Sequence, residues 1–216
     1  MSPKSEIIYF SKLCYRNEFL SATDGNISVR TGNNNILTTA TRTCKGFLTT
    51  KDLIEVNMEG KPLRGKGKIS TEFKLHQYIY RQRKDINAVV HTHPRFSTAF
   101  AAAGIALDKI VFPEIYIFFD KIPLAMYATP STDEVPKSIA PYVKKYDAIL
   151  LANHGLVTFG KTLEEAYFKT EKVEHIAEIS FYARLLGGEK HLTKAQVKKL
   201  DKIKKQIVKS LPAAGR

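Results

Sequence analysis

The sequence is poor in cysteine and has no long apolar run. Its two cysteines, Cys14 and Cys44, cannot form the disulfide framework that holds small secreted domains together. No apolar run approaches the ~20 residues that a membrane-spanning helix needs. The first residues, from Met1 to Glu6, lack the apolar core of a signal peptide. We therefore expect a cytoplasmic protein with no membrane partner.

Length and composition favour one folded domain. The chain has 216 residues, of which 44% are hydrophobic and 25% charged, which is ordinary for a globular protein with a sizeable core. No internal repeat and no low-complexity linker divides it. We expect a single domain over residues 1–216, with a lysine-rich helical segment from about residue 190.

Acidic residues are scarce beside basic ones, 21 against 34, which gives a net charge of +13. Such a charge suits nucleic-acid binding, and it equally suits a basic cleft that attracts small anionic substrates. Eight lysines crowd the segment from Lys190 to Lys209, and no aromatic side chains interleave with them. A lysine-rich helix without stacking residues is most simply a solvated face, so we expect no nucleic-acid partner.

The spacing of apolar residues predicts an irregular alternation of helices and strands. Helices are expected over residues 5–20, from 70–72 onward, over 95–103, over 131–146 and from 162 to about 186. Strands are expected over 27–30, 36–39, 53–57, 86–93, 110–119, 124–127, 148–152 and after 155. Several of these strands are joined by hairpin-type turns. The fold class that follows is α/β, with three α/β/α layers around a mostly antiparallel sheet.

One predicted strand ends on two histidines, His91 and His93, separated by one residue. Alternate side chains of a strand share a face, and their Cα atoms lie about 6.6 Å apart. Two imidazoles at that separation can converge on one metal ion. Pro94 cannot donate to a strand ladder, so the pair should lie at the rim of the sheet. Taken alone, this pattern equally fits two polar residues at a strand end.

A third histidine, His154, follows another apolar strand and precedes Gly155. If both strand ends face the same place, His91, His93 and His154 can close on one ion. Three imidazoles with a free fourth position are typical of a catalytic zinc site. The remaining histidines lie among charged residues and are interpreted as solvated or half-buried side chains: His76, His175 and His191.

Four short motifs in this order resemble a known family: Gly25-Asn26-Ile27-Ser28, Ser70-Thr71-Glu72, His91-Thr92-His93-Pro94 and Asn153-His154-Gly155. They are similar to those of the class II sugar-phosphate aldolases of the fuculose-1-phosphate aldolase type. The same superfamily includes ribulose-5-phosphate 4-epimerases, methylthioribulose-1-phosphate dehydratases and the adducin head domain. The resemblance covers residues 5–187.

The resemblance implies a role for each matching residue. His91, His93 and His154 would bind Zn²⁺, one ion per subunit, with other divalent metals as alternatives. Glu72 would be the acid/base carboxylate, and Tyr116 would serve the site of a neighbouring subunit in a homotetramer. The residues implied to bind the phosphate and the rest of the substrate are Gly25, Asn26, Thr41, Arg42, Ser70 and Thr71.

Arg42 departs from the family pattern, because it stands where glycine is expected. The substitution removes a conformationally permissive position and adds a guanidinium fork suited to phosphate or carboxylate. An exposed loop residue with no such role is the alternative interpretation. The identity of the substrate depends on this loop.

The resemblance implies a metal-dependent lyase that cleaves a phosphorylated ketose, such as fuculose 1-phosphate, to dihydroxyacetone phosphate and an aldehyde. A dehydratase acting on methylthioribulose 1-phosphate would use the same groups and stays open. A pentulose-phosphate 4-epimerase is disfavoured, because such epimerases carry aspartate where Glu72 stands. An adducin-like binding protein is disfavoured too, because all three histidines are intact.

Overall fold

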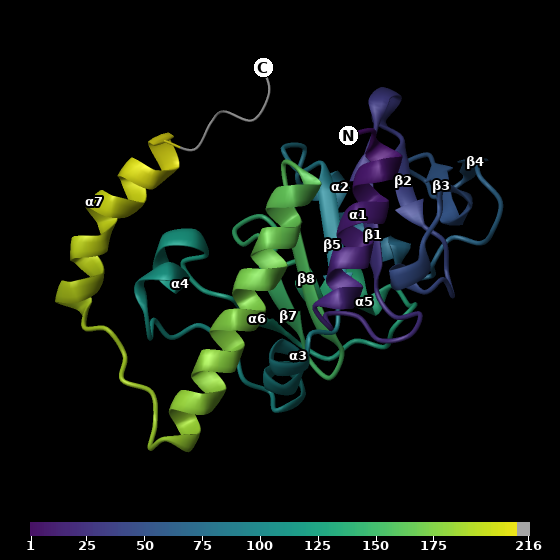
Figure 1. The fold of residues 1–216 in the computed structure, drawn as a ribbon. Coiled ribbons are helices and arrows are strands. Elements are labelled where there is room, and N and C mark those ends of the chain that lie inside the picture. Colours follow the sequence, from purple (N-terminus) through teal and green to yellow (C-terminus); the bar gives the residue numbers. More distant parts are fainter. Residues whose placement is uncertain (211–216) are drawn as a thin grey trace.

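The structure, a computed structural model, describes residues 1–210 and is built on one eight-stranded sheet (Figure 1). The strand order is β4-β3-β2-β1-β5-β8-β7-β6. The strands are β1 (Asn26–Arg30), β2 (Ile36–Thr39), β3 (Leu53–Val56), β4 (Pro62–Arg64), β5 (Ala88–Thr92), β6 (Leu124–Ala125), β7 (Ala148–Leu151) and β8 (Gly155–Gly160). Only β6 and β7 pair in parallel among these strands, so the predicted, mostly antiparallel sheet is confirmed.

Helices cover both faces of the sheet. They are α1 (Pro3–Arg16), α2 (Phe73–Gln82), α3 (Arg95–Ala102), α4 (Pro113–Phe118), α5 (Glu134–Ile139), α6 (Leu163–Leu185) and α7 (Lys194–Ser210). Short 3-10 turns are η1 (Gly32–Asn34), η2 (Lys45–Phe47) and η3 (Thr50–Asp52). In Figure 1, α1 and α6 lie in front of the sheet, and α2 and α5 lie behind it. The three predicted α/β/α layers are therefore confirmed.

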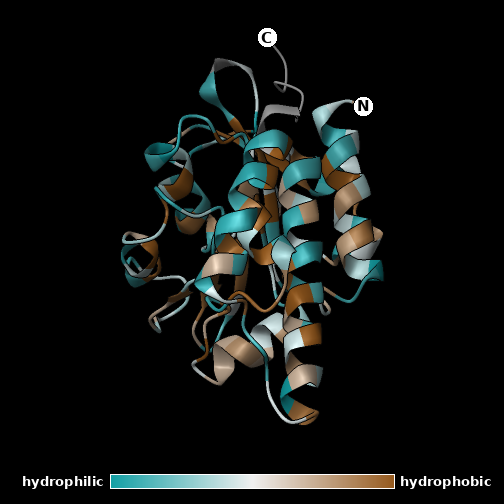
Figure 2. Ribbon diagram, turned by 90° about the vertical axis from the view of Figure 1, so that its left-hand side faces the viewer, coloured by the Kyte–Doolittle hydropathy of each residue, from teal (hydrophilic) through white to brown (hydrophobic). Residues whose placement is uncertain are grey.

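Alternation along the central strand β5 supplies both halves of the core. Val89 faces the helices α2 and α5, where it packs in one cluster with Ile79 and Ile139. Ala88 and Val90 face the opposite side and pack in another cluster with residues of α1 and α6. Figure 2 shows hydrophilic and hydrophobic residues alternating along α1, which begins at the end marked N, and along its neighbour α6. Because both faces are buried, β5 is held rigidly, and its end is a fixed platform for side chains.

Several predicted elements differ from the structure in type or length, and the differences are largest over residues 110–119 and 131–146. The run over 110–119 was expected to be a strand, but residues Pro113–Phe118 form the helix α4. A short apolar run has no decisive period, and Pro113 stands at the first helical position, which it favours. The helix expected over 131–146 ends at Ile139, because Pro141 has no N–H to continue the helical ladder. In the part of the chain that the structure describes, no side chain caps the start of this helix, and the Glu134 carboxylate accepts from the Thr129 N–H.

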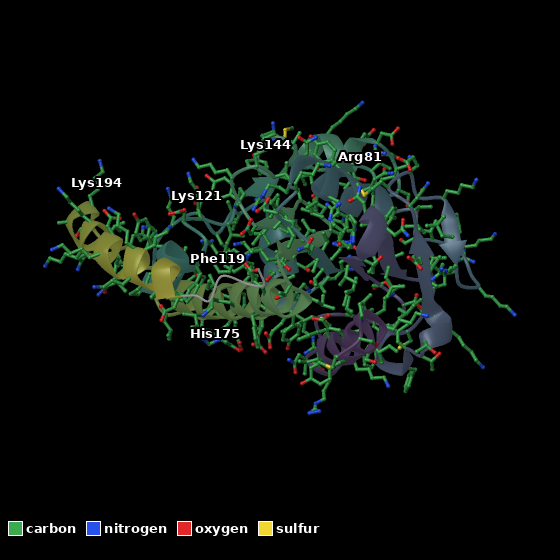
Figure 3. The ribbon with its side chains drawn as sticks, turned by 90° about the horizontal axis from the view of Figure 1, so that it is seen from above. Arg81, Phe119, Lys121, Lys144, His175 and Lys194 are labelled. Carbon is green, nitrogen blue, oxygen red and sulfur yellow. The ribbon has the colours of Figure 1, made fainter. Side chains whose placement is uncertain are left out.

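The lysine-rich segment forms the helix α7, which packs against α4. Tyr116 of α4 donates its hydroxyl hydrogen to the Asp201 carboxylate of α7. The ammonium of Lys204 donates to the Tyr116 carbonyl over 3.0 Å. Seen from above, Lys194 at the start of α7 lies at the outer end of the molecule (Figure 3). Across residues 1–210, no helix combines the length and apolar character of a membrane span.

Candidate metal centre and active site

Two of the three predicted metal ligands lie where β5 ends. The strand stops at Thr92, and Pro94 begins the turn into α3, as its missing N–H requires. His91 is fully buried between β1 and β8, while the backbone N–H of His93 donates to the Phe19 carbonyl over 2.9 Å. Both side chains are therefore positioned by backbone contacts on either side of the strand.

The third histidine lies in the tight turn between β7 and β8. Asn153 takes a left-handed backbone, with φ +55°, which lets the chain reverse at once. Gly155 passes directly under the other histidines. A Cβ at this position would lie 2.6 Å from His93 Cδ2 and 2.6 Å from the Thr92 carbonyl oxygen. The small residue after His154 is therefore required for the turn to approach β5.

The three imidazoles converge. Their ring centroids are 4.8 Å apart for His91 and His154, 5.0 Å for His91 and His93, and 5.2 Å for His93 and His154. One ligand atom from each ring lies within 4.8 Å of the other two. The ring nitrogen Nδ1 of His91 donates to the Leu156 carbonyl over 2.9 Å, so Nε2, which lies 3.3 Å from His93 Nε2, is the nitrogen that faces the group and would bind a metal. This donor set fits a divalent metal ion such as zinc.

The electrostatics favour the ligand form of His93. Burial, together with the charges of His91 and His154, lowers the pKa of His93 to about 3. Its imidazole is therefore neutral near pH 7, and a neutral imidazole nitrogen is the form that binds a metal.

Glu72 lies directly against the histidines, at the residue that precedes α2. Its Oε1 lies 3.0 Å from His154 Nε2, and its Oε2 lies 3.7 Å from His91 Nε2. Burial opposes ionisation, but the charges and hydrogen bonds of His91 and His154 outweigh it and hold the pKa of the Glu72 carboxyl well below its usual range. An ionised carboxylate at the open side of three imidazoles can accept a proton from a group held there.

Asn26 contacts Glu72, and its predicted role in substrate binding stays a prediction. Its Nδ2 donates to Glu72 Oε2 over 3.0 Å, and its side chain is buried. Its Oδ1 has no hydrogen-bond partner within residues 1–210. In this structure Asn26 therefore orients the carboxylate.

A cavity of about 270 Å³ adjoins the metal group and the carboxylate. Five of the six predicted substrate-binding residues line it: Gly25, Thr41, Arg42, Ser70 and Thr71. Glu72 and His93 form its wall towards the histidines. Thr71 Oγ1 lies 2.6 Å from the hydroxyl oxygen of Ser131, which also lines the cavity. Hydroxyl groups and the N-terminal end of α2 are suited to phosphate oxygens.

Arg42 keeps the backbone of the glycine that it replaces. Its φ is +58°, in the left-handed region that glycine adopts without strain. Its side chain is exposed at the mouth of the cavity.

Lys45 is a cavity residue that was not predicted from the sequence. A lysine in a polar loop is usually solvated, yet Lys45 is only 1% exposed. Burial lowers the pKa of Lys45 to about 8, although the charges of Asp24, Cys44 and Glu72 oppose that shift.

His76 also differs from its expected environment. It is fully buried under the site, and its Nδ1 lies 2.7 Å from the hydroxyl oxygen of Ser28. Burial, and then the charge of His91, lowers the pKa of His76 to about 3. The one sequence signal for its place near the site was its spacing, because residues four apart, here Glu72 and His76, lie on the same side of a helix.

Tyr116 is not brought to the histidines within the described chain. It lies on α4, and its hydroxyl contacts Asp201 of α7. The expectation that Tyr116 serves a neighbouring subunit stays a prediction.

Comparison with known proteins identifies relatives along most of the chain. The family model described as "Class II Aldolase and Adducin N-terminal domain" matches residues 5–181. An L-fuculose phosphate aldolase of Methanococcus maripaludis strain C5 is 37% identical over 183 residues, which cover 85% of this chain and 98% of that protein. A 3-oxo-tetronate 4-phosphate decarboxylase of Escherichia coli is 29% identical over 205 residues, which cover 92% and 95% of the two chains.

The fold has matching solved structures. The structure of an L-fuculose 1-phosphate aldolase superposes with a TM-score of 0.86 at 25% identity and covers 94% of this chain and 96% of its own. The predictions of a class II aldolase-like fold and of an enzyme of the lyase class are confirmed by this fold and these relatives. The chain belongs to the class II aldolase and adducin N-terminal domain family.

Proposed function

We propose that this protein is a metal-dependent aldolase that cleaves a phosphorylated ketose, such as fuculose 1-phosphate, to dihydroxyacetone phosphate and an aldehyde. The observation that carries the proposal is the convergence of His91, His93 and His154 beside Glu72, at the wall of a cavity lined by hydrogen-bond donors. The similarity to an L-fuculose phosphate aldolase supports the same reaction class.

The three histidines would hold one Zn²⁺ per chain, with manganese or cobalt as alternatives. When bound, the ion would act as a Lewis acid that stabilises negative charge next to the ketone. Leu156 supports this role, because its carbonyl fixes the His91 ring so that Nε2 faces His93 and would be free to bind the ion.

Glu72 would move the proton on the substrate carbon. The carboxylate is ionised, and the amide of Asn26 holds one of its oxygens over 3.0 Å. The other oxygen faces His154. A positioned acid/base group of this kind is worth ~10²–10⁴-fold in rate.

The cavity would bind the phosphate end of the ketose through Gly25, Thr41, Ser70 and Thr71. Contacts to a group far from the breaking bond supply binding energy that can be used to orient the reacting end. The net charge of +13 favours the approach of such an anion.

Tyr116 would complete the site of a neighbouring subunit in a cytoplasmic homotetramer. Its hydroxyl would then protonate the oxygen on the aldehyde side of the breaking bond. Its position on α4, on the far side of α6 from the α1 end of the sheet, supports action outside its own chain (Figure 1).

Decarboxylation of a 3-oxo-tetronate 4-phosphate is the second candidate. The similarity to the E. coli decarboxylase favours it, and loss of carbon dioxide beside a ketone leaves the same kind of negative charge as carbon–carbon cleavage. A methylthioribulose-1-phosphate dehydratase would also use Glu72 and a metal. An epimerase is less well supported, because Glu72 stands where epimerases of this superfamily carry aspartate.

The deciding experiment is a panel of ketose 1-phosphates, a 3-oxo-tetronate 4-phosphate and methylthioribulose 1-phosphate, assayed with the metal-loaded protein. Formation of dihydroxyacetone phosphate from at least one ketose 1-phosphate is expected. Release of carbon dioxide from the tetronate, without cleavage of any ketose phosphate, would contradict the aldolase proposal and support the decarboxylase. Inactivity on every compound would contradict both.

A further inference from the structure

The ammonium group of Lys45 is buried in the wall of the cavity, where backbone carbonyl groups hold it in place. Its Nζ donates to the Thr23 carbonyl over 2.9 Å and to the Thr43 carbonyl over 3.0 Å. Thr23 precedes β1 and Thr43 follows β2, so the lysine joins two segments of that wall. An ammonium group has three N–H donors, and these two carbonyls use two of them.

The local packing directs Lys45 inward. It is the first residue of the short turn η2, which lies against α1. A Cβ at the next residue, Gly46, would lie 2.4 Å from the ring carbon Cδ1 of Tyr15. The bare glycine therefore lets η2 pack closely on α1, and this placement turns the lysine side chain towards the cavity.

The charge of Lys45 has no carboxylate partner of its own. Its hydrogen-bond partners within residues 1–210 are neutral carbonyl oxygens. The charges of Asp24 and Glu72 act on Lys45 from nearby, but among the described residues neither carboxylate forms an ion pair with its ammonium: Asp24 lies 3.9 Å from His93 Nδ1, and Glu72 contacts His154. A buried charge is costly unless it is paired. A positive charge of this kind, in a cavity lined by hydroxyl groups, is matched by an anionic ligand.

Arg42 is the obvious competitor for the same role, but its surroundings differ. Its side chain is exposed, so its interaction with an anion is screened by water. The desolvated ammonium of Lys45 interacts more strongly with the same anion, because the local dielectric is lower.

We propose that Lys45 is the specificity-determining cation of this cavity: it binds the phosphate group of the substrate, and Arg42 at the rim contributes little. This inference rests on the proposed function in one respect, since it takes the substrate to be phosphorylated. It assigns the charge recognition to a residue that none of the four motifs contains.

The test is the binding of inorganic phosphate to the metal-loaded protein, measured by isothermal titration calorimetry, with Lys45→Gln, Arg42→Gln and Lys51→Gln compared. Lys45→Gln should weaken phosphate binding at least ~10-fold, the size of one lost charged hydrogen bond. Arg42→Gln should change it less than about threefold, and the exposed control Lys51→Gln should leave it unchanged.

A second ligand distinguishes a purely structural role of Lys45 from direct phosphate binding. Acetohydroxamate chelates metals and carries no phosphate, so its affinity should be the same in Lys45→Gln and the wild type. Equal loss of both ligands, or a larger effect of Arg42→Gln than of Lys45→Gln on phosphate, overturns the proposal, as does the absence of phosphate binding to the wild type. Should Lys45→Gln fail to fold, Lys45→Met, which keeps the aliphatic stem, takes its place under the same criteria.

These outcomes are independent of the proposed reaction. Phosphate binding that depends on Lys45 stands even if no ketose phosphate is cleaved. Cleavage of a ketose phosphate with phosphate binding unchanged in Lys45→Gln would leave the reaction in place and remove Lys45 from it.

Discussion

Replacing Glu72 by glutamine tests the proposed division of labour between the carboxylate and the histidines. Glutamine has nearly the same shape, and its amide oxygen can still accept from Asn26 Nδ2, now 3.0 Å from Glu72 Oε2. The change removes the negative charge and the ability to take up a proton. The three imidazoles keep their backbone contacts, including the 2.9 Å hydrogen bond from His91 to Leu156. Metal binding should therefore persist while proton transfer is lost.

The expected size of the effect is a 10²–10⁴-fold lower kcat, the usual contribution of a positioned acid/base group, which is roughly 3–5 kcal/mol of transition-state stabilisation. The change in KM should be small, because the groups that line the phosphate cavity are untouched. The assay is steady-state formation of dihydroxyacetone phosphate from the best ketose 1-phosphate of the panel, with metal content measured on the same sample.

The matched control is Glu59→Gln, at an exposed glutamate far from the cavity lining. It should have wild-type turnover. A Glu72→Gln protein that is fully metal-loaded and turns over within about threefold of the wild type would remove Glu72 from the mechanism. Loss of the metal in this variant would instead make Glu72 a ligand.

Two further predictions concern the frame around the site. Gly155→Ala should lower metal occupancy and destabilise the fold by about 1–3 kcal/mol, because the added methyl would lie 2.6 Å from both His93 Cδ2 and the Thr92 carbonyl. Metal analysis and urea unfolding measure the two effects. Unchanged metal content and stability would mean that the turn has room for the methyl group. His76 should make the metal-free protein sensitive to acid: its folded pKa of about 3 lies below the ordinary value of 6.5, so the unfolded state binds the extra proton and stability falls as the pH drops from 6.5 towards 3. The slope contributed is at most ~1.4 kcal/mol per pH unit, and His76→Gln should be less steep by that amount in urea unfolding at several pH values; an identical slope would contradict the burial of a neutral imidazole.

The sequence predicted those parts of the fold whose apolar period is long or whose ends carry a strong signal. The helix from Leu163 to Leu185 begins at a Thr162 cap that accepts from the Glu165 N–H, at the residue where the apolar spacing predicted its start. The histidines were found because strand alternation and Pro94 fix where β5 ends. Such local rules hold when no tertiary contact competes with them.

Other features depend on contacts between distant segments. The apolar run over 110–119 fits a strand or a helix equally well, and packing of α4 on α7 is visible only in three dimensions. The sequence alone predicts a solvated loop position for Lys45, because its burial depends on the packing of η2 against α1. The hydrogen bond of Asn26 to Glu72 joins residues 46 positions apart in the chain, so it too is visible only in three dimensions.

The most direct test of the metal centre is metal analysis combined with X-ray absorption spectroscopy on protein purified without added metal. About one divalent ion per chain is expected, bound by three imidazole nitrogens at ~2.0–2.1 Å, with markedly lower occupancy in His154→Ala. A protein that binds no ion, or that keeps full occupancy without His154, would contradict the shared site of His91, His93 and His154.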